Sequence, residues 1–206
     1  MYSEKELGKL LADISSVDPV PGGGAVSAMA ASMAGALGVM VASLTIEKDG
    51  KVELKPLMEK CNKLSHECLK LSDDDSKAYT KVMTAYQMPK NTPEEKKKRT
   101  EAIQESLQIA TIVPLRTAEC SLQIIESALE LLEKGRKGAY SDAVVSAVLA
   151  RAAFEGAFAN VDINIAHIKD EKFLNSINLN VKELKHKFNR SSVLIDERLK
   201  EKSQTH

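Results

Sequence analysis

Residues 18–46 read DPVPGGGAVSAMAASMAGALGVMVASLTI. Two prolines and three glycines in the first seven residues predict an irregular turn that ends at Gly24. The 22 residues from Ala25 to Ile46 carry no charge, and more than half of them are Ala, Gly, Ser or Thr. Small side chains form one helical stripe (Ala28, Ala31, Gly35, Gly38, Ala42, Thr45) and large ones form another (Val26, Met29, Met33, Leu37, Met40, Leu44). A helix with both stripes is predicted to be buried on all sides.

An uncharged segment of this length could also span a bilayer, and small-residue stripes join membrane helices. No second segment of comparable length lacks charge. We therefore expect a buried central helix of a soluble protein with no membrane partner.

Most of the remaining chain repeats apolar residues with helical spacing. Thr92 and Pro93 predict a helix start, whereas Pro114 predicts a kink near Ala110. Ser141 is the expected cap of a later helix, which carries its own small stripe (Ser146, Ala150, Ala153, Ala157, Asn160, Asn164). The expected fold is all-α: one domain over residues 1–206, built as an antiparallel up-and-down bundle of long helices, with helices at 4–14, 25–46, 52–88, 93–132, 142–167 and 169–202.

The composition excludes several classes of protein. Lys and Arg number 29 and Asp and Glu number 29, so no net positive charge attracts nucleic acid. The three cysteines lack a CxxC pair and the four histidines lack an HxxxH pair, so we expect no metal. No signal peptide precedes the first helix, which predicts a cytoplasmic protein.

The glycine turn Gly22–Gly24 is the first candidate site, because free backbone N–H groups at a helix start bind anions. Its alternative is a flexible turn between helices. Asp75 shares a helical face with Leu71 and Tyr79, and a carboxylate on a largely apolar face is a candidate general base. Its alternative is a solvated acidic run. Arg116 could clamp a carboxylate or lie at the surface.

Three further polar residues fall on the later helix. Asp142 lies at its start, where it could act in catalysis or only complement the helix dipole. Asn160 and Asn164 end the small stripe, so their amides must hydrogen-bond either to the protein or to a ligand. The cysteines are expected in the core (Cys61, Cys68, Cys120).

These segments together resemble the family of formiminotetrahydrofolate cyclodeaminases and methenyltetrahydrofolate cyclohydrolases. The resemblance rests on a series of motifs in order: Asp18–Gly24 with its small-residue helix, Leu71–Tyr79 with Asp73 and Asp75, Ala85–Lys90, Val113-Pro114-Leu115, Ser141-Asp142-Ala143, and Asn160–Asn164. One departure is Ala25 directly after the glycines, where the family often has Ser; Ser27 follows two positions later.

The resemblance implies a free-standing homodimer with a tetrahydrofolate derivative as substrate and no tightly bound cofactor or metal. It implies a cyclohydrolase that adds water to 5,10-methenyltetrahydrofolate and forms 10-formyltetrahydrofolate. The alternatives are an ammonia-releasing cyclodeaminase and a non-catalytic folate-binding dimer. Asp75 and Asp142 are the expected catalytic residues, and the expected substrate-binding residues are Gly22, Gly23, Gly24, Ser27, Arg116, Asn160 and Asn164.

Overall fold

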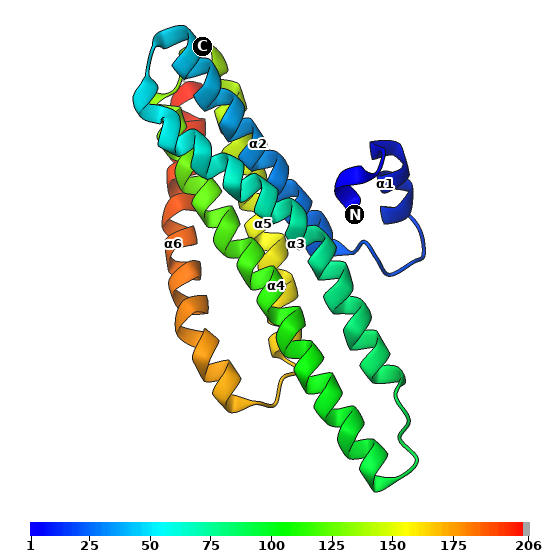
Figure 1. Ribbon diagram of the computed structural model, residues 1–206. Coiled ribbons are helices and arrows are strands. Elements are labelled where there is room, and N and C mark those ends of the chain that lie inside the picture. Colours follow the sequence, from blue (N-terminus) through cyan, green and yellow to red (C-terminus); the bar gives the residue numbers. More distant parts are fainter. Residues whose placement is uncertain (204–206) are drawn as a thin grey trace.

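The computed structural model describes residues 1–203, and this part of the chain contains helices and no strand (Figure 1). The predicted all-helical fold is confirmed. The elements are η1 (Tyr2–Glu4), α1 (Leu7–Ile14), α2 (Gly23–Asp49), η2 (Val52–Leu54), α3 (Lys55–Gln87), α4 (Pro93–Lys134), η3 (Lys137–Ala139), α5 (Tyr140–Ile165) and α6 (Glu171–Ser203).

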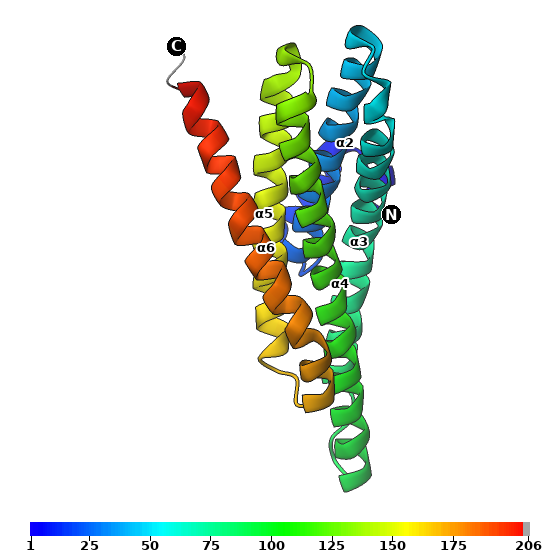
Figure 2. The same cartoon turned by 90° about the vertical axis from the view of Figure 1, so that its left-hand side faces the viewer.

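The four helices α2 to α5 lie side by side along a common direction, and each contacts two or three of the others (Figure 1). Helix α6 returns along α4 and α5, and its C-terminal end diverges from them (Figure 2). The short α1 buries none of its residues. It is anchored through η1, where Tyr2 N–H donates to Asp73 Oδ1 at 2.9 Å and Tyr2 Oη lies 2.7 Å from Ser76 Oγ.

The bounds of α2 and α5 correct two predictions. Helix α2 already begins at Gly23, so two of the three glycines are helical, and it ends only at Gly50, whose φ of +71° favours glycine. The cap of α5 is Ala139, without a side-chain hydrogen bond, and Ser141 lies inside the helix. The preceding turn of η3 already starts the helical path, so α5 needs no side-chain cap there. The Thr92 cap is confirmed, with a complete capping box formed by Glu95.

The small stripe of α2 is buried, as predicted. It allows close contact with two helices at once. Ser146 Oγ of α5 donates to the Ala34 carbonyl at 2.7 Å, and Gly35 packs against the α3 backbone near Cys61 and Ser65. The three cysteines are buried among these contacts, which confirms their place in the core.

The large stripe of α2 is buried only in part, with Met29 buried and Leu37 and Leu44 half-buried, which corrects the prediction that the helix is covered on all sides. Val26, Met33 and Met40 keep 38%, 56% and 38% of their surface exposed. On α5, Val145 and Ile163 are similarly exposed. The small stripes are the most completely covered, because they allow the closest backbone approach. Two helical stretches, α2 and 137–165, are long and apolar enough to cross a membrane, with 61% and 44% of their most apolar windows buried.

Helix α4 continues through Pro114 without interruption. Proline lacks an N–H, so it leaves the carbonyl of Ala110 without its helical donor. Asn164 Nδ2 of α5 donates to that carbonyl at 2.7 Å. The Asn164 side chain therefore supplies the hydrogen bond that Pro114 cannot donate to Ala110.

The contact at Gly35 generates a stability prediction. A Cβ on Gly35 would lie 3.0 Å from Ser65 Cβ and 3.2 Å from the Cys61 carbonyl oxygen. We expect Gly35→Val to lower the free energy of unfolding by about 1–3 kcal/mol, because the core cannot take the added atoms. Gly8→Ala is the matched control, since nothing lies within 4 Å of that Cβ. Urea denaturation measures both; an equal loss in both variants would contradict the prediction.

Candidate active site

The site begins where α2 starts. Gly22 is the N-cap in an extended conformation and offers no side chain to the first turn of the helix. The first backbone N–H groups of a helix have no partner within it. Here the Asp75 carboxylate of α3 is the partner of one of these groups and accepts a hydrogen bond from the Ala25 N–H. A Cβ on Gly24 would overlap this carboxylate, so only glycine permits the contact.

The glycine turn thus holds a carboxylate, and that carboxylate is the chain's own. The Ala25 N–H therefore already has a carboxylate partner, and binding of a substrate carboxylate at the turn stays a prediction. Burial raises the pKa of Asp75 from 3.8 to about 6, and the hydrogen bond from Ala25 partly opposes the shift. Asp75 can therefore change its protonation state close to neutral pH, as a general acid or base must.

The opposite side of the turn is formed by α5. Asn160 Nδ2 donates to the Gly156 carbonyl at 2.9 Å and would lie 3.9 Å from a Cβ on Gly23. Ser27 Oγ donates to the Gly23 carbonyl at 2.8 Å and occupies the space where a Cβ of Gly156 would be. Asn160 Oδ1 accepts no hydrogen bond from a residue that the structure describes, whereas Ser27 serves the packing of α2 on α5.

The structure therefore brings together, from three helices, most of the residues predicted for the site: Gly22, Gly23, Gly24, Ser27, Asp75 and Asn160. Asn164 follows one turn later on α5, but its amide nitrogen is used by the Ala110 carbonyl. Its first role is structural.

Arg116 is not part of this cluster. It donates to Glu67 at 2.6 Å and to Glu119 at 2.9 Å. Both carboxylates raise the pKa of Arg116, and Arg116 in turn lowers the pKa of Glu67. The guanidinium clamps carboxylates of its own chain, so binding of a substrate carboxylate stays a prediction.

Asp142 lies at the other end of α5. Eighteen residues separate it from Asn160, or about 27 Å at 1.5 Å per helical residue. Within one chain, Asp142 and Asp75 cannot act on the same bond. The two predicted catalytic carboxylates are thus separated by about two thirds of the length of α5.

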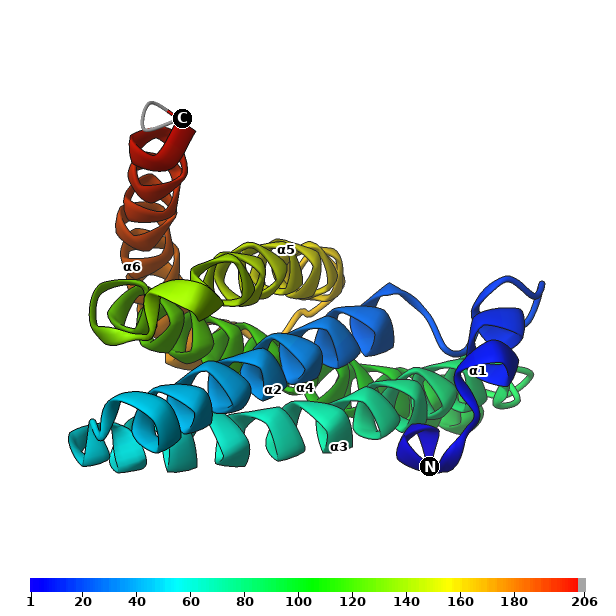
Figure 3. The same ribbon diagram turned by 90° about the horizontal axis from the view of Figure 1, so that it is seen from above.

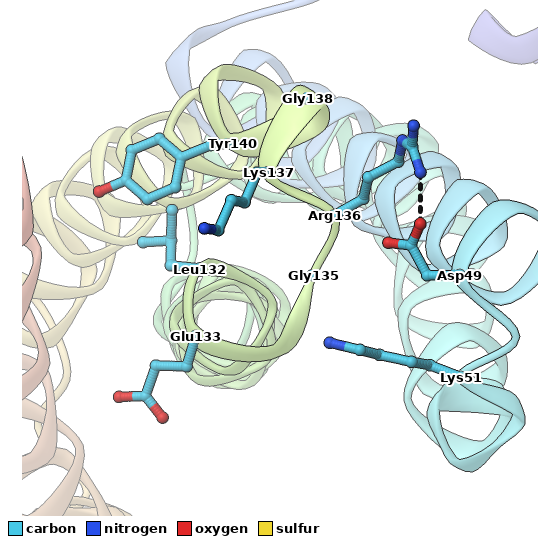
Figure 4. A pocket seen from close by; sticks show the side chains of 9 residues that line it. All are labelled: Asp49, Lys51, Leu132, Glu133, Gly135, Arg136, Lys137, Gly138 and Tyr140. Atoms are coloured by element: carbon cyan, nitrogen blue, oxygen red, sulfur yellow. Dashed lines mark hydrogen bonds and ion pairs between the residues drawn. The ribbon is translucent and has the colours of Figure 1, made fainter.

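A pocket of about 750 Å³ lies at the Asp142 end, around the turn from Gly135 to Gly138 (Figure 4). Arg136 pairs there with Asp49, and Lys51 Nζ donates to the Lys134 carbonyl at 2.6 Å. None of the residues that line this pocket belongs to the Asp75 cluster, so the volume of a pocket does not identify the candidate active site. Among the described residues, no three His, Cys, Asp or Glu side chains form a group that could hold a metal ion.

Sequence reasoning missed three contributors to the site. The Ala25 N–H holds Asp75, Gly156 makes room for Ser27, and Tyr2 contacts Asp73 and Ser76 on either side of Asp75. Adjacency to the glycine turn could have pointed to Ala25. Nothing in the local sequence marks Tyr2, because its partners lie more than 70 residues away.

Comparison with known proteins agrees with this architecture. The family model described as formiminotransferase-cyclodeaminase matches residues 6–183. A methenyltetrahydrofolate cyclohydrolase from Methylorubrum extorquens is 37% identical over 177 residues, which cover 84% of this chain and 85% of that protein. The formimidoyltransferase-cyclodeaminase of Gallus gallus is 34% identical over 195 residues, but the match covers only 36% of its length. A formiminotetrahydrofolate cyclodeaminase structure from Thermotoga maritima superposes with a TM-score of 0.84 at 27% identity, covering 97% of this chain and 98% of that one.

The helical fold and these matches place the protein in the class of all-helical cyclodeaminase-like proteins. The chain belongs to the formiminotransferase-cyclodeaminase family.

The buried carboxylate generates a pH prediction. Because the pKa of Asp75 is raised in the folded state, its contribution to stability is present below pH 3.8 and lost as pH rises through about 6. Asp75→Asn removes the buried charge and keeps an oxygen for the Ala25 N–H. We expect the variant to gain stability over wild type at pH 7.5, by at most about 3 kcal/mol, and to lose this gain by pH 4. Urea titrations at both pH values measure it; a variant less stable at pH 7.5 would show that the charge is structural.

Proposed function

We propose that the protein is a methenyltetrahydrofolate cyclohydrolase, which converts 5,10-methenyltetrahydrofolate and water to 10-formyltetrahydrofolate. The observation that carries the proposal is the Asp75 carboxylate, held against Gly24 with a pKa raised to about 6. The relative named as a cyclohydrolase supports it, because the match spans 85% of that protein.

The chemistry suits a single buried carboxylate. The methenyl bridge between N5 and N10 is a delocalised cation, which the negative charge of Asp75 stabilises. A water oxygen attacks the bridge carbon while Asp75 accepts the water proton. The C–N5 bond then breaks with its electron pair on N5, which takes the proton back from Asp75. The hydroxyl proton leaves to solvent as the formyl C=O forms, so the cation and water yield a neutral product and one proton. Written this way, the reaction needs no cofactor.

Asn160 is proposed to bind the pterin. Its Nδ2 is engaged by Gly156, so Oδ1 remains to accept a hydrogen bond from the pterin edge. The partly exposed Gly23 beside it lets the flat ring approach the backbone without a side chain in the way.

The second candidate is formiminotetrahydrofolate cyclodeaminase, favoured by the similar structure that carries this name. Asp75 would then protonate the departing amine as the ring closes. 5,10-Methenyltetrahydrofolate is the substrate of the first reaction and the product of the second. Absorbance of its chromophore therefore follows both activities, as decay in one and as appearance in the other.

The activity prediction concerns Asp75. We expect purified protein to accelerate the decay of the methenyl chromophore, and Asp75→Asn to lower kcat/KM at least about tenfold, or about 1.4 kcal/mol in the barrier. Below pH 6 the wild-type kcat/KM is expected to fall with pH, because protonated Asp75 cannot accept the water proton. Absorbance against a no-protein control measures both effects.

Asp74→Asn is the matched control for this variant. Asp74 is the neighbouring acid, points to solvent and pairs with Lys77 at 3.0 Å. Its loss should leave activity unchanged. Folate binding without turnover in either direction would instead support the non-catalytic dimer, and full activity of Asp75→Asn would refute the proposed base.

We further propose that the up-and-down bundle assembles as a homodimer through the exposed stripes of α2 and α5. These two helices lie side by side (Figure 3). A face two helices wide, about 20 Å, and about 40 Å long offers roughly 800 Å² per partner, the size of a standard stable interface. Large side chains on α2 could pack against small ones on α5 of the second copy.

Met33 lies at the centre of the proposed interface and is 56% exposed. We expect Met33→Lys to convert the dimer to a monomer, because a charge cannot be buried there unpaired. Leu179→Lys on α6, at a position 76% exposed, is the control and should remain dimeric. Light scattering on both variants measures the mass; an unchanged dimer for Met33→Lys would exclude this interface.

A further inference from the structure

Helices α2 and α3 run in opposite directions, and their contacts show which residues lie at the same height. Ser65 Oγ of α3 donates to the Ser32 carbonyl of α2 at 2.9 Å. Further along α3, the Asp75 carboxylate lies against Gly24, which comes earlier on α2. One turn beyond Asp75, this correspondence reaches a height at which α2 has not yet begun, because α2 starts at Gly23. Helix α3 therefore extends past the start of α2 (Figure 1).

The face of α3 that packs on α2 changes in character at this height. Over the length of α2 it carries small buried side chains such as Cys61, which lies against Gly38. Beyond Asp75 the same face continues, at spacings of 3 and 4, with three large side chains: Tyr79, Met83 and Tyr86. They keep 38%, 39% and 42% of their surface exposed. These three residues, the α3 stripe, form an apolar and largely aromatic surface that begins one turn from Asp75.

Tyr79 is the member of the α3 stripe closest to Asp75. The two residues are four positions apart, which corresponds to about 6 Å of rise and about 40° of rotation. Helical side chains lean toward the N-terminus of their helix, so the Tyr79 ring leans toward the Asp75 carboxylate. The Tyr79 hydroxyl makes no hydrogen bond with any residue that the structure describes, whereas the Tyr86 ring faces the Arg99 guanidinium at 5.6 Å. Tyr79 thus presents an aromatic ring beside the candidate base.

We propose that Tyr79 binds the substrate by stacking on its benzoyl ring, which is the aromatic ring attached to N10. This inference rests on the proposed function and deepens it, because it assigns a binding residue to a part of the substrate that does not react. In the proposed site the pterin lies at Gly23 and Asn160, and the bridge between N5 and N10 lies at Asp75. The benzoyl ring follows the bridge directly, so it also lies next to Asp75, where the α3 stripe begins.

The two surfaces match in chemistry and in scale. The benzoyl ring is flat, apolar and uncharged, and aromatic rings pair with their centroids about 4.5–7 Å apart. The rise of about 6 Å from Asp75 to Tyr79 lets the ring lie on Tyr79 while the bridge lies at the carboxylate. Met83 extends this surface by a further turn, and thioethers pack well against the edges of aromatic rings. Since the benzoyl ring does not react, Tyr79 binds the substrate and the transition state equally.

A kinetic experiment separates this role from catalysis. We expect Tyr79→Ala to raise KM for 5,10-methenyltetrahydrofolate about tenfold and to leave kcat within about twofold, because the loss of uniform binding appears in KM. Tyr79→Phe keeps the ring and should retain the wild-type KM, whereas Tyr79→Leu keeps apolar volume without a flat ring and should also raise KM. Urea denaturation of each variant checks that its fold is intact.

Tyr86→Ala is the matched control for these variants. Tyr86 belongs to the same stripe and is as exposed as Tyr79, but it lies about 17 Å along the helix from Asp75. Its loss should leave KM unchanged, because the benzoyl ring does not reach it when the bridge is at Asp75.

Binding without turnover separates this inference from the proposed reaction. 5-Formyltetrahydrofolate carries the same pterin and benzoyl rings but has no methenyl bridge. Isothermal titration calorimetry should show about tenfold weaker binding of this compound to Tyr79→Ala than to wild type, and unchanged binding to Tyr79→Phe and Tyr86→Ala. In wild type, nuclear Overhauser effects should connect tyrosine ring protons to the benzoyl protons of the bound compound. These signals should disappear in Tyr79→Leu.

The possible outcomes distinguish failure of the inference from failure of the proposed function. Turnover by wild type, with unchanged KM and unchanged binding in Tyr79→Ala, overturns the inference and leaves the function standing. The tenfold loss of binding without turnover in either direction supports the inference and refutes the proposed reaction. An equal loss in Tyr79→Phe, or tyrosine signals to the pterin alone, overturns stacking on the benzoyl ring. Absence of both binding and turnover overturns the two together.

Discussion

The close approach of α2 to its neighbours is the constraint on which the rest of the structure depends. Its small stripe leaves the backbone within reach of α3 and α5, so Ser146 can bond to the Ala34 carbonyl and Gly35 can touch the α3 backbone. Larger residues at these positions would push the helices apart. The same closeness at the first turn of α2 allows the Asp75 carboxylate to contact Gly24.

This geometry gives Asp75 two properties that oppose each other. The carboxylate fills an anion position at a helix start, which favours the charge, and it is half-buried and partly desolvated, which disfavours the charge. Burial prevails, and the pKa rises to about 6. A group held in this balance destabilises the folded state at neutral pH, as is common for residues retained for chemistry rather than for packing.

The exposed side of the bundle is as informative as its core. The central helix carries no charge between Ala25 and Ile46 to mark an outer face, yet Val26, Met33 and Met40 remain exposed in the single chain. These exposed apolar side chains form the surface through which we propose that a second copy binds.

The sequence by itself determined the helical class, the break before the long uncharged helix and the helix start at Thr92, and it made Asp75 a candidate, because propensity, capping and one-face periodicity are local. Three features were decided only by the tertiary structure: the exposure of Met33, the use of Asn164 to satisfy Ala110, and the separation of Asp142 from Asp75. Each depends on which helices become neighbours and in which direction they run. Helical periodicity cannot supply this information, because it shows that a face is apolar but not what covers it.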